Sequence, residues 1–151
     1  MEKIDALRFA LTGKTQQIGR HWRRLVHDIV AAHGVSDAAA VPLIQIERMG
    51  GGVNQTEVAD AIGIEGASLV RLLDQLCVSG LIERREGADR RAKTLWLTAE
   101  GERVTSVIEQ ELVALRARIL GHVSQEDIEA TLRVFRAIEE ASARQQAEAA
   151  T

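Results

Sequence analysis

The stretch that decides the fold is residues 54–101, NQTEVADAIGIEGASLVRLLDQLCVSGLIERREGADRRAKTLWLTAEG. It predicts two short helices followed by a hairpin. Asn54 and Glu57 have the spacing of a capping box, in which each side chain bonds the backbone N–H of the other residue, so a helix is expected to begin here. Gly63 supplies its stop. A second helix is expected over about residues 65–79, because leucines recur there at helical spacing.

The outer side of this second helix predicts contact with DNA. With the leucines facing inward, the residues left outside are Ala67, Ser68, Arg71 and Gln75. Small side chains at the front of a helix let it approach base edges in a major groove. An arginine one turn later can make two parallel hydrogen bonds to guanine or hold a phosphate.

The hairpin that follows carries a basic run. Its first strand is expected to open at Leu81, its turn to lie at residues 87–89, and its return strand to span residues 93–97, before Thr98 caps a long helix. The tip carries Asp89, Arg90 and Arg91. A flexible arm tipped with arginine suits a narrow, electronegative minor groove. Asp89 is expected to brace Arg91 across the turn.

Helix pair and basic hairpin together predict a winged helix-turn-helix. The simpler interpretation is an ordinary helical pair beside a solvated charge run. We favour DNA binding because the cap, the two helices, the wing and the arginine tip occur in one order.

On these residues the chain resembles the MarR family of bacterial transcriptional regulators, and within it the SlyA branch. The matching segments are AIGIEGASLVRLLDQL (61–76), SGLIERR (79–85), DRRAKTLWLT (89–98) and HWRRLV (21–26). The resemblance implies a homodimer, with six helices and a β-wing in each chain, whose two wings straddle DNA. It also implies DNA contacts from the second helix and the wing tip, at Ala67, Ser68, Arg71, Asp89, Arg90 and Arg91.

The composition is that of an ordinary globular domain. The 151 residues are 46% hydrophobic and 27% charged, with a net charge of −3 and a single cysteine. A disulfide framework is therefore excluded, and no apolar run is long enough for a membrane span or a signal peptide. We expect a cytoplasmic protein without membrane contact. The overall negative charge does not decide against DNA binding, because the local basic tip decides the contact.

Long helices flank the predicted reader. Residues 5–33 have one apolar stripe at near-heptad spacing, and a lone helix of this kind needs a partner, for which a second copy of the chain is expected. The next helix, 37–49, contains Pro42 well past its first turn, so a bend at Val41 or an irregular first turn is expected. Gly50-Gly51-Gly52 predicts a turning link.

Two further helices complete the chain, over about residues 98–120 and after a Ser124 cap. The predicted fold class is mainly α with a small β-wing: a winged helix-turn-helix domain plus a helical dimerisation domain. Residues 1–35 and 120–147 are assigned to dimerisation, and residues 36–119 to the winged helix-turn-helix with its connecting helix. Two-fold symmetry then predicts a pseudo-palindromic operator in double-stranded DNA, with half-sites about one helical turn apart.

Catalytic and metal chemistry find no support in the sequence. His21, His27 and His33 are spaced by six residues, which turns successive side chains about 120° apart around a helix, whereas metal pairs on helices want a spacing of three or four. Cys77 lies among apolar residues, as a packed thiol does. No phosphate loop, nucleophile elbow or paired carboxylate site is present. We expect neither an enzyme nor a bound metal or cofactor.

The resemblance also suggests a ligand site. SlyA-like proteins line a site for small aromatic acids with an Arg-x-Trp-Arg run, matched here by Arg20, His21, Trp22 and Arg23. A guanidinium can hold a carboxylate while an indole packs on an aromatic ring. The alternative leaves Trp22 in a subunit interface and the arginines solvated or on DNA phosphates.

Three functions follow from these observations. The first is a dimeric regulator, expected to be a repressor, whose DNA affinity is modulated by a small aromatic carboxylate. The second is a constitutive DNA-binding architectural or counter-silencing factor without a natural ligand. The third, a protein-interaction dimer that has lost DNA binding, is disfavoured by the intact basic residues of helix and wing.

Overall fold

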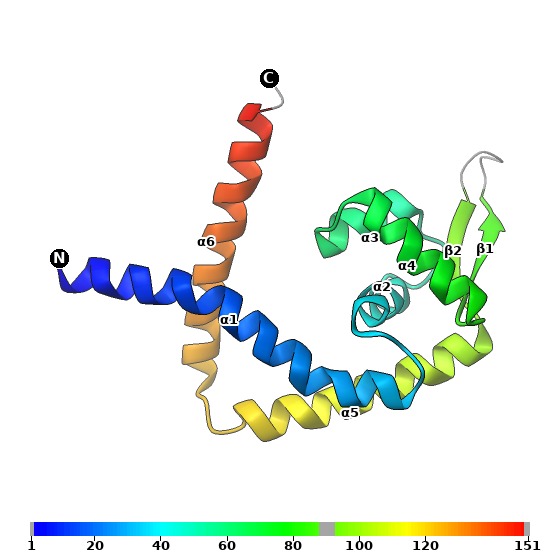
Figure 1. Cartoon of the computed structure of the whole chain (residues 1–151), viewed down its shortest axis with the longest axis horizontal. Coiled ribbons are helices and arrows are strands. Elements are labelled where there is room, and N and C mark those ends of the chain that lie inside the picture. The colour runs from blue at the N-terminus through cyan, green and yellow to red at the C-terminus, as the bar shows by residue number, and fades with distance from the viewer. Residues whose placement is uncertain (1, 88–92, 150–151) are drawn as a thin grey trace. The chain divides into compact units, whose positions relative to one another are not determined.

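A computed structural model of the chain describes residues 2–87 and 93–149. It consists of six helices and one hairpin: α1 (Lys3–Ala32), α2 (Asp37–Arg48), α3 (Gln55–Ile62), α4 (Gly66–Val78), β1 (Ile82–Glu86), β2 (Lys93–Leu97), α5 (Ala99–Leu120) and α6 (Gln125–Ala149) (Figure 1). The predicted fold class, mainly α with a small β-wing, is confirmed. Two compact units divide after Leu112. The division predicted from the sequence, dimerisation segments 1–35 and 120–147 around a DNA-binding region 36–119, was drawn by function and remains a prediction.

The first unit, residues 1–112, is built around α2. This helix contacts α1, α3, α4 and β2, and α4 in turn contacts α3 and β1. The core consists of aliphatic side chains that α2, α4 and α5 contribute, including Leu43, Ile46, Leu69, Leu73 and Ile108, all fully buried. The predicted inward leucines of α4 therefore hold this helix by one face, although Leu72 is only half-buried.

The helix ends are where their side chains predict. The capping box is present, since Asn54 Oδ1 accepts from the Glu57 N–H at 3.0 Å and the Asn54 N–H donates to Glu57 Oε2 at 2.7 Å. Gly63 ends α3 in the left-handed conformation, with φ of 68°. Thr98 closes the hairpin onto α5: its hydroxyl donates to the Gly80 carbonyl at 2.6 Å and accepts the Gly101 N–H at 3.0 Å.

Pro42 does not divide its helix. α2 runs without interruption from Asp37 to Arg48 with Pro42 buried inside it, so the irregular first turn, one of the two alternatives expected from the sequence, is wrong, whereas the bend at Val41 remains a prediction. The first turn is regular because Ser36 caps it, accepting the Ala39 N–H at 3.3 Å. The missing proline N–H is a single lost bond in a helix that packs against four other elements.

A third chain segment extends the two-stranded wing. β1 and β2 pair antiparallel, with Arg84 opposite Leu95 and Arg85 opposite Thr94. On the other edge of β2, the Leu95 N–H donates to the Val53 carbonyl at 2.7 Å. The glycine link before Val53 is thereby tied to the wing.

The second unit, residues 113–151, contains the end of α5 and all of α6. Ser124 caps α6, accepting the Asp127 N–H at 3.1 Å. No side chain of α6, which is described over its full length, is buried. Its apolar side chains recur at helical spacing and are between 36% and 53% exposed: Ile128, Leu132, Phe135 and Ile138.

Among the described helices, no single one is long and apolar enough to cross a membrane. The pair α1 and α2, bent by 78°, reaches that length and composition only when the two helices are taken together.

Candidate functional site

In the helix pair α3–α4, the second helix has one exposed face. Ala67, Ser68, Arg71 and Gln75 all lie on the exposed side of α4, opposite its buried leucines. Three residues, 63–65, separate the two helices. The front of α4 therefore carries only small side chains, and Arg71 stands one turn behind them.

The wing adds basic side chains next to this face. Arg84 reaches back to α4, where its Nη2 lies 2.7 Å from Asp74 Oδ1. The Arg85 guanidinium lies 4.8 Å from the Trp96 ring centroid and its Nε donates to Glu83 Oε1 at 2.6 Å. Both arginines are therefore held at the base of the wing. The predicted tip residues Asp89, Arg90 and Arg91 lie outside the described residues.

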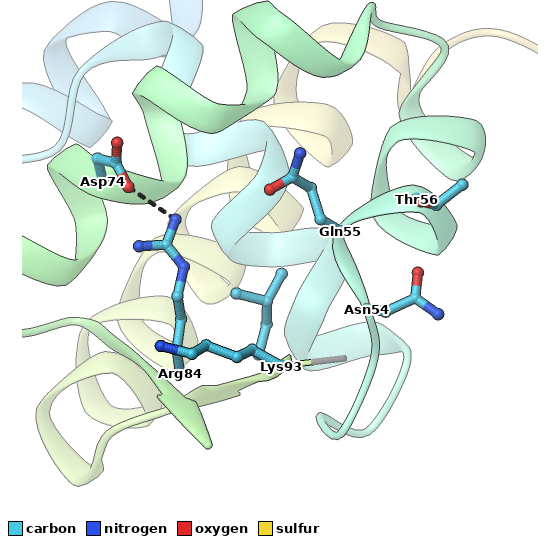
Figure 2. Close-up of a pocket in the computed structure, with 7 residues that line it drawn as sticks. Asn54, Gln55, Thr56, Asp74, Arg84 and Lys93 are labelled. Atoms are coloured by element: carbon cyan, nitrogen blue, oxygen red, sulfur yellow. Dashed lines mark hydrogen bonds and ion pairs between the residues drawn. The ribbon is translucent and has the colours of Figure 1, made fainter. Parts of the chain in front are cut away.

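A polar cavity of about 710 Å³ lies between helix pair and wing. Figure 2 shows the Arg84 and Lys93 side chains from the two strands together with Gln55 and Thr56 from the start of α3. The sequence-based site did not include this set. Asp74 could have been found, because it lies three residues after Arg71 and so on the same side of the helix.

A second cavity, of about 400 Å³, lies where α1 meets the start of α2. It is lined by Arg20, Arg23, Arg24, His27 and Asp37. The His27 Nδ1 is 3.0 and 3.1 Å from the two Asp37 carboxylate oxygens, which ties α1 to α2. The cavity combines three guanidinium groups with one carboxylate.

Two of the four predicted ligand residues line this cavity and two do not. Arg20 and Arg23 do, whereas His21 and Trp22 are not among its described lining residues. Trp22 follows Arg20 by two residues, or about 200° around the helix, and is half-buried on the apolar side. The structure of the single chain thus brings the guanidinium groups together without the indole.

Other titratable groups of the first unit lie near the wing base. Partial burial, followed by the neighbouring carboxylates of Glu109 and Glu102, raises the pKa of Glu47 above its ordinary value. On the exposed side of α5, the hydrogen bond from Arg103 lowers the pKa of Glu100. The raised pKa of Glu47 reflects partial burial beside two other carboxylates, whereas the lowered pKa of Glu100 reflects an ion pair on the surface.

Metal-ligating side chains do not gather in the described parts of the chain: no group of three or more histidine, cysteine or acidic residues is placed to hold an ion. His27 and His33 contact carboxylates instead, His33 Nε2 lying 3.0 Å from Glu111 Oε1. Cys77 is a half-buried free thiol.

The helix pair and the wing are similar to those of known proteins. The family model described as MarR family matches residues 33–92. Staphylococcus aureus MarR in complex with salicylate and kanamycin is 21% identical, over 94% of this chain and 96% of that chain, with a TM-score of 0.80. The transcriptional regulator SlyA is 18% identical (89% and 95% covered, TM-score 0.79), and S. aureus MepR in complex with DNA is 16% identical (83% and 91%, TM-score 0.76). At such identities the likeness shows the winged-helix fold.

Proposed function

We propose, because the family model described as MarR family matches residues 33–92, that this chain is a homodimeric, sequence-specific DNA-binding transcription regulator. In this proposal it acts as a repressor, and a small aromatic acid changes its affinity for DNA. Such a role requires a cytoplasmic protein, which stays a prediction.

The exposed front of α4 is the observation that carries the proposal. Leu69, Leu73 and Leu76 fix the helix by its buried face, so the orientation of Arg71 toward solvent is set by the core. A small-residue front followed by an arginine suits major-groove docking. S. aureus MepR, which has a similar fold, forms a complex with DNA.

The wing supports the same function. Arg84 and Arg85 are paired with Asp74 and Glu83, which orders their guanidinium groups at the wing base before any DNA arrives, although each pair is neutral overall. Side chains ordered in advance lose less conformational freedom on binding. We further predict that Arg90 and Arg91, with Asp89 as brace, contact the minor groove from the tip of the wing.

Unburied apolar stripes support the dimer. In α1 the side chains of Leu7, Leu11 and Ile18 are 41–58% exposed, and in α6 no side chain is buried. Monomeric proteins rarely leave long contiguous apolar faces to water, whereas homodimer interfaces bury them. A second copy of this chain is the partner proposed for both helices, which agrees with the predicted dimerisation segments 1–35 and 120–147. A pseudo-palindromic operator follows from the two-fold axis.

The arginine cavity supports ligand control. Arg20 and Arg23 can hold a carboxylate by paired hydrogen bonds. S. aureus MarR, which also has a similar fold, forms a complex with salicylate and kanamycin. The ligand changes DNA affinity only if it binds the DNA-competent and DNA-incompetent dimers with different affinity.

One observation favours the second function, a constitutive architectural factor. Trp22 and His21 do not line the cavity with the arginines, so in the single chain an aromatic ring would find no indole wall. A regulator without such a wall would bind DNA whether or not aromatic acids are present.

The test is fluorescence anisotropy on DNA from upstream of the protein's own gene, with random DNA alongside, repeated with benzoate and salicylate. Specific binding weakened by one acid supports the regulator, and specific binding indifferent to both supports the architectural factor. Arg71→Ala should cost about 1–3 kcal/mol on the specific site only. Arg8→Ala, on α1 and paired with Asp5, is the control. No preference over random DNA, on any upstream fragment tried, contradicts the proposal.

A further inference from the structure

We propose that the cavity beside α1 takes an anion with two negative charges, the chemistry shared by a dicarboxylate and a phosphate monoester. The inference rests on the proposed ligand response and specifies the charge of the ligand. It is carried by Arg24, His27 and Asp37, none of which belongs to the sequence-predicted ligand set.

The basic residues form one face of α1. Arg20, Arg23, Arg24 and His27 follow each other at spacings of three, one and three, which places them within an arc of about 100°. Like charges three and four residues apart destabilise an isolated helix by a few tenths of a kcal/mol per pair. Three exposed arginines on one arc therefore lower helix stability slightly, and an anion among them would offset this repulsion.

Charges within the cavity are only partly compensated. Three guanidinium groups face one carboxylate, and Asp37 has both oxygens on His27. Within residues 2–87 and 93–149, the guanidinium groups of Arg20 and Arg23 have no hydrogen bond or ion pair. Arg24 contacts only the His21 ring there, at 3.5 Å. The three guanidinium groups exceed the one carboxylate by two positive charges, which remain to be matched.

A monoanion leaves this cavity incompletely paired. One carboxylate can take one guanidinium by two hydrogen bonds. A ligand seated in this open depression of about 400 Å³ also displaces part of the water from the other, exposed guanidinium groups, and a partly desolvated charge without a partner loses hydration free energy. A second anionic group pairs the next arginine and removes this cost. The lining residues span only about two turns of α1 and the first residue of α2, which suits a small ligand better than the backbone of a nucleic acid, which needs an extended groove.

Isothermal titration calorimetry on the full chain at constant ionic strength tests the inference. Benzoate, phthalate and phenyl phosphate share a ring and differ in charge. We expect both dianions to bind about tenfold or more tightly than benzoate. Arg24→Gln should bring the three ligands to within about threefold of one another, and the matched variant Arg8→Gln, on an exposed turn of the same helix, should keep the preference.

Each remaining outcome overturns the inference. Equal affinity for benzoate and phthalate removes the need for two charges, and a dianion preference untouched by Arg24→Gln locates the anion elsewhere. In a third outcome, the parent chain binds no dianion and Arg24→Gln loses the dimer in sedimentation. The basic face of α1 would then bind acidic side chains of a second copy. DNA anisotropy on the same samples separates the two proposals. Specific DNA binding without dianion preference defeats the inference alone, whereas dianion binding without specific DNA binding defeats the proposed regulator.

Discussion

Alanine at Gly51 is expected to destabilise the first unit more than alanine at Gly50. Both glycines belong to the link between α2 and Val53 and both have left-handed backbone, with φ of 71° and 82°. A Cβ at Gly51 would lie 2.8 Å from Cε3 of Trp96, whereas at Gly50 it would meet no described atom within 4 Å. The two substitutions thus share the backbone strain and differ in one steric contact.

The size of the difference follows from how firmly Trp96 is held. Its Nε1–H donates to the Thr94 hydroxyl at 3.0 Å, and Arg85 lies over its ring. The left-handed conformation costs an L-residue about 1–2 kcal/mol at either glycine. Overpacking against a fixed indole adds about 1–3 kcal/mol at Gly51 alone. In a chain of this length each kcal/mol lowers the melting temperature by roughly 2–4 °C.

Urea unfolding followed by far-ultraviolet circular dichroism measures both variants. Protomer concentration is held equal, because dimerisation would make stability depend on it. The smaller ring of Trp96→Phe, combined with Gly51→Ala, should recover part of the loss relative to the sum of the single changes. Equal destabilisation by the Gly50 and Gly51 variants would refute the packing of Trp96 on this link.

Two further changes test local energetics. Asn54→Ala should cost about 1 kcal/mol in urea unfolding, because it removes the acceptor of the Glu57 N–H, and an unchanged midpoint would contradict the cap. Burial, then Glu109 and Glu102, raises the pKa of Glu47 from 4.5, so its charged form costs folding free energy above that pH and none well below it. Glu47→Gln should therefore stabilise the protein at pH 7 and leave it unchanged near pH 3.5, as compared by urea unfolding at the two values; equal effects at both would count against this.

Sequence-based prediction succeeded where the causes are local. The capping box at Asn54, the stop at Gly63 and the strand at residues 93–97 depend on neighbours within a few positions, and the structure contains all three. The irregular first turn, one of the two alternatives expected from Pro42, is absent, because packing from four elements outweighs one missing hydrogen bond. Tertiary contacts override a local preference in such a case.

Contacts between distant residues could not be predicted in the same way. Arg84 meets Asp74 across ten positions, and Trp96 covers a glycine link more than forty residues before it. Both depend on how strands and helices pack. The cavity residue Arg24 was within reach, because a spacing of four places it on the same face of α1 as Arg20. The family motif drew attention to adjacent residues instead, although adjacent helical residues point in different directions.

The apolar stripe of α6 gives the sharpest test of the dimer. Leu132 is 53% exposed and no side chain of α6 is buried, so Leu132→Asp removes little packing from the single chain. If a second copy covers this face, however, the new carboxylate is buried without a partner, which costs several kcal/mol per interface. Because a two-fold axis repeats each interface contact, both copies bear the change.

Sedimentation velocity over a range of concentrations should therefore show a dimer for the parent chain and a monomer for Leu132→Asp, with far-ultraviolet circular dichroism unchanged. Ala137→Asp is the matched control, since it introduces the same charge at an exposed position about 140° from Leu132, on the side of α6 opposite the apolar stripe. Dissociation by both variants would indicate general charge repulsion. Dissociation by neither would remove α6 from the interface, and the exposed stripe of α1 alone would then have to hold the two copies together.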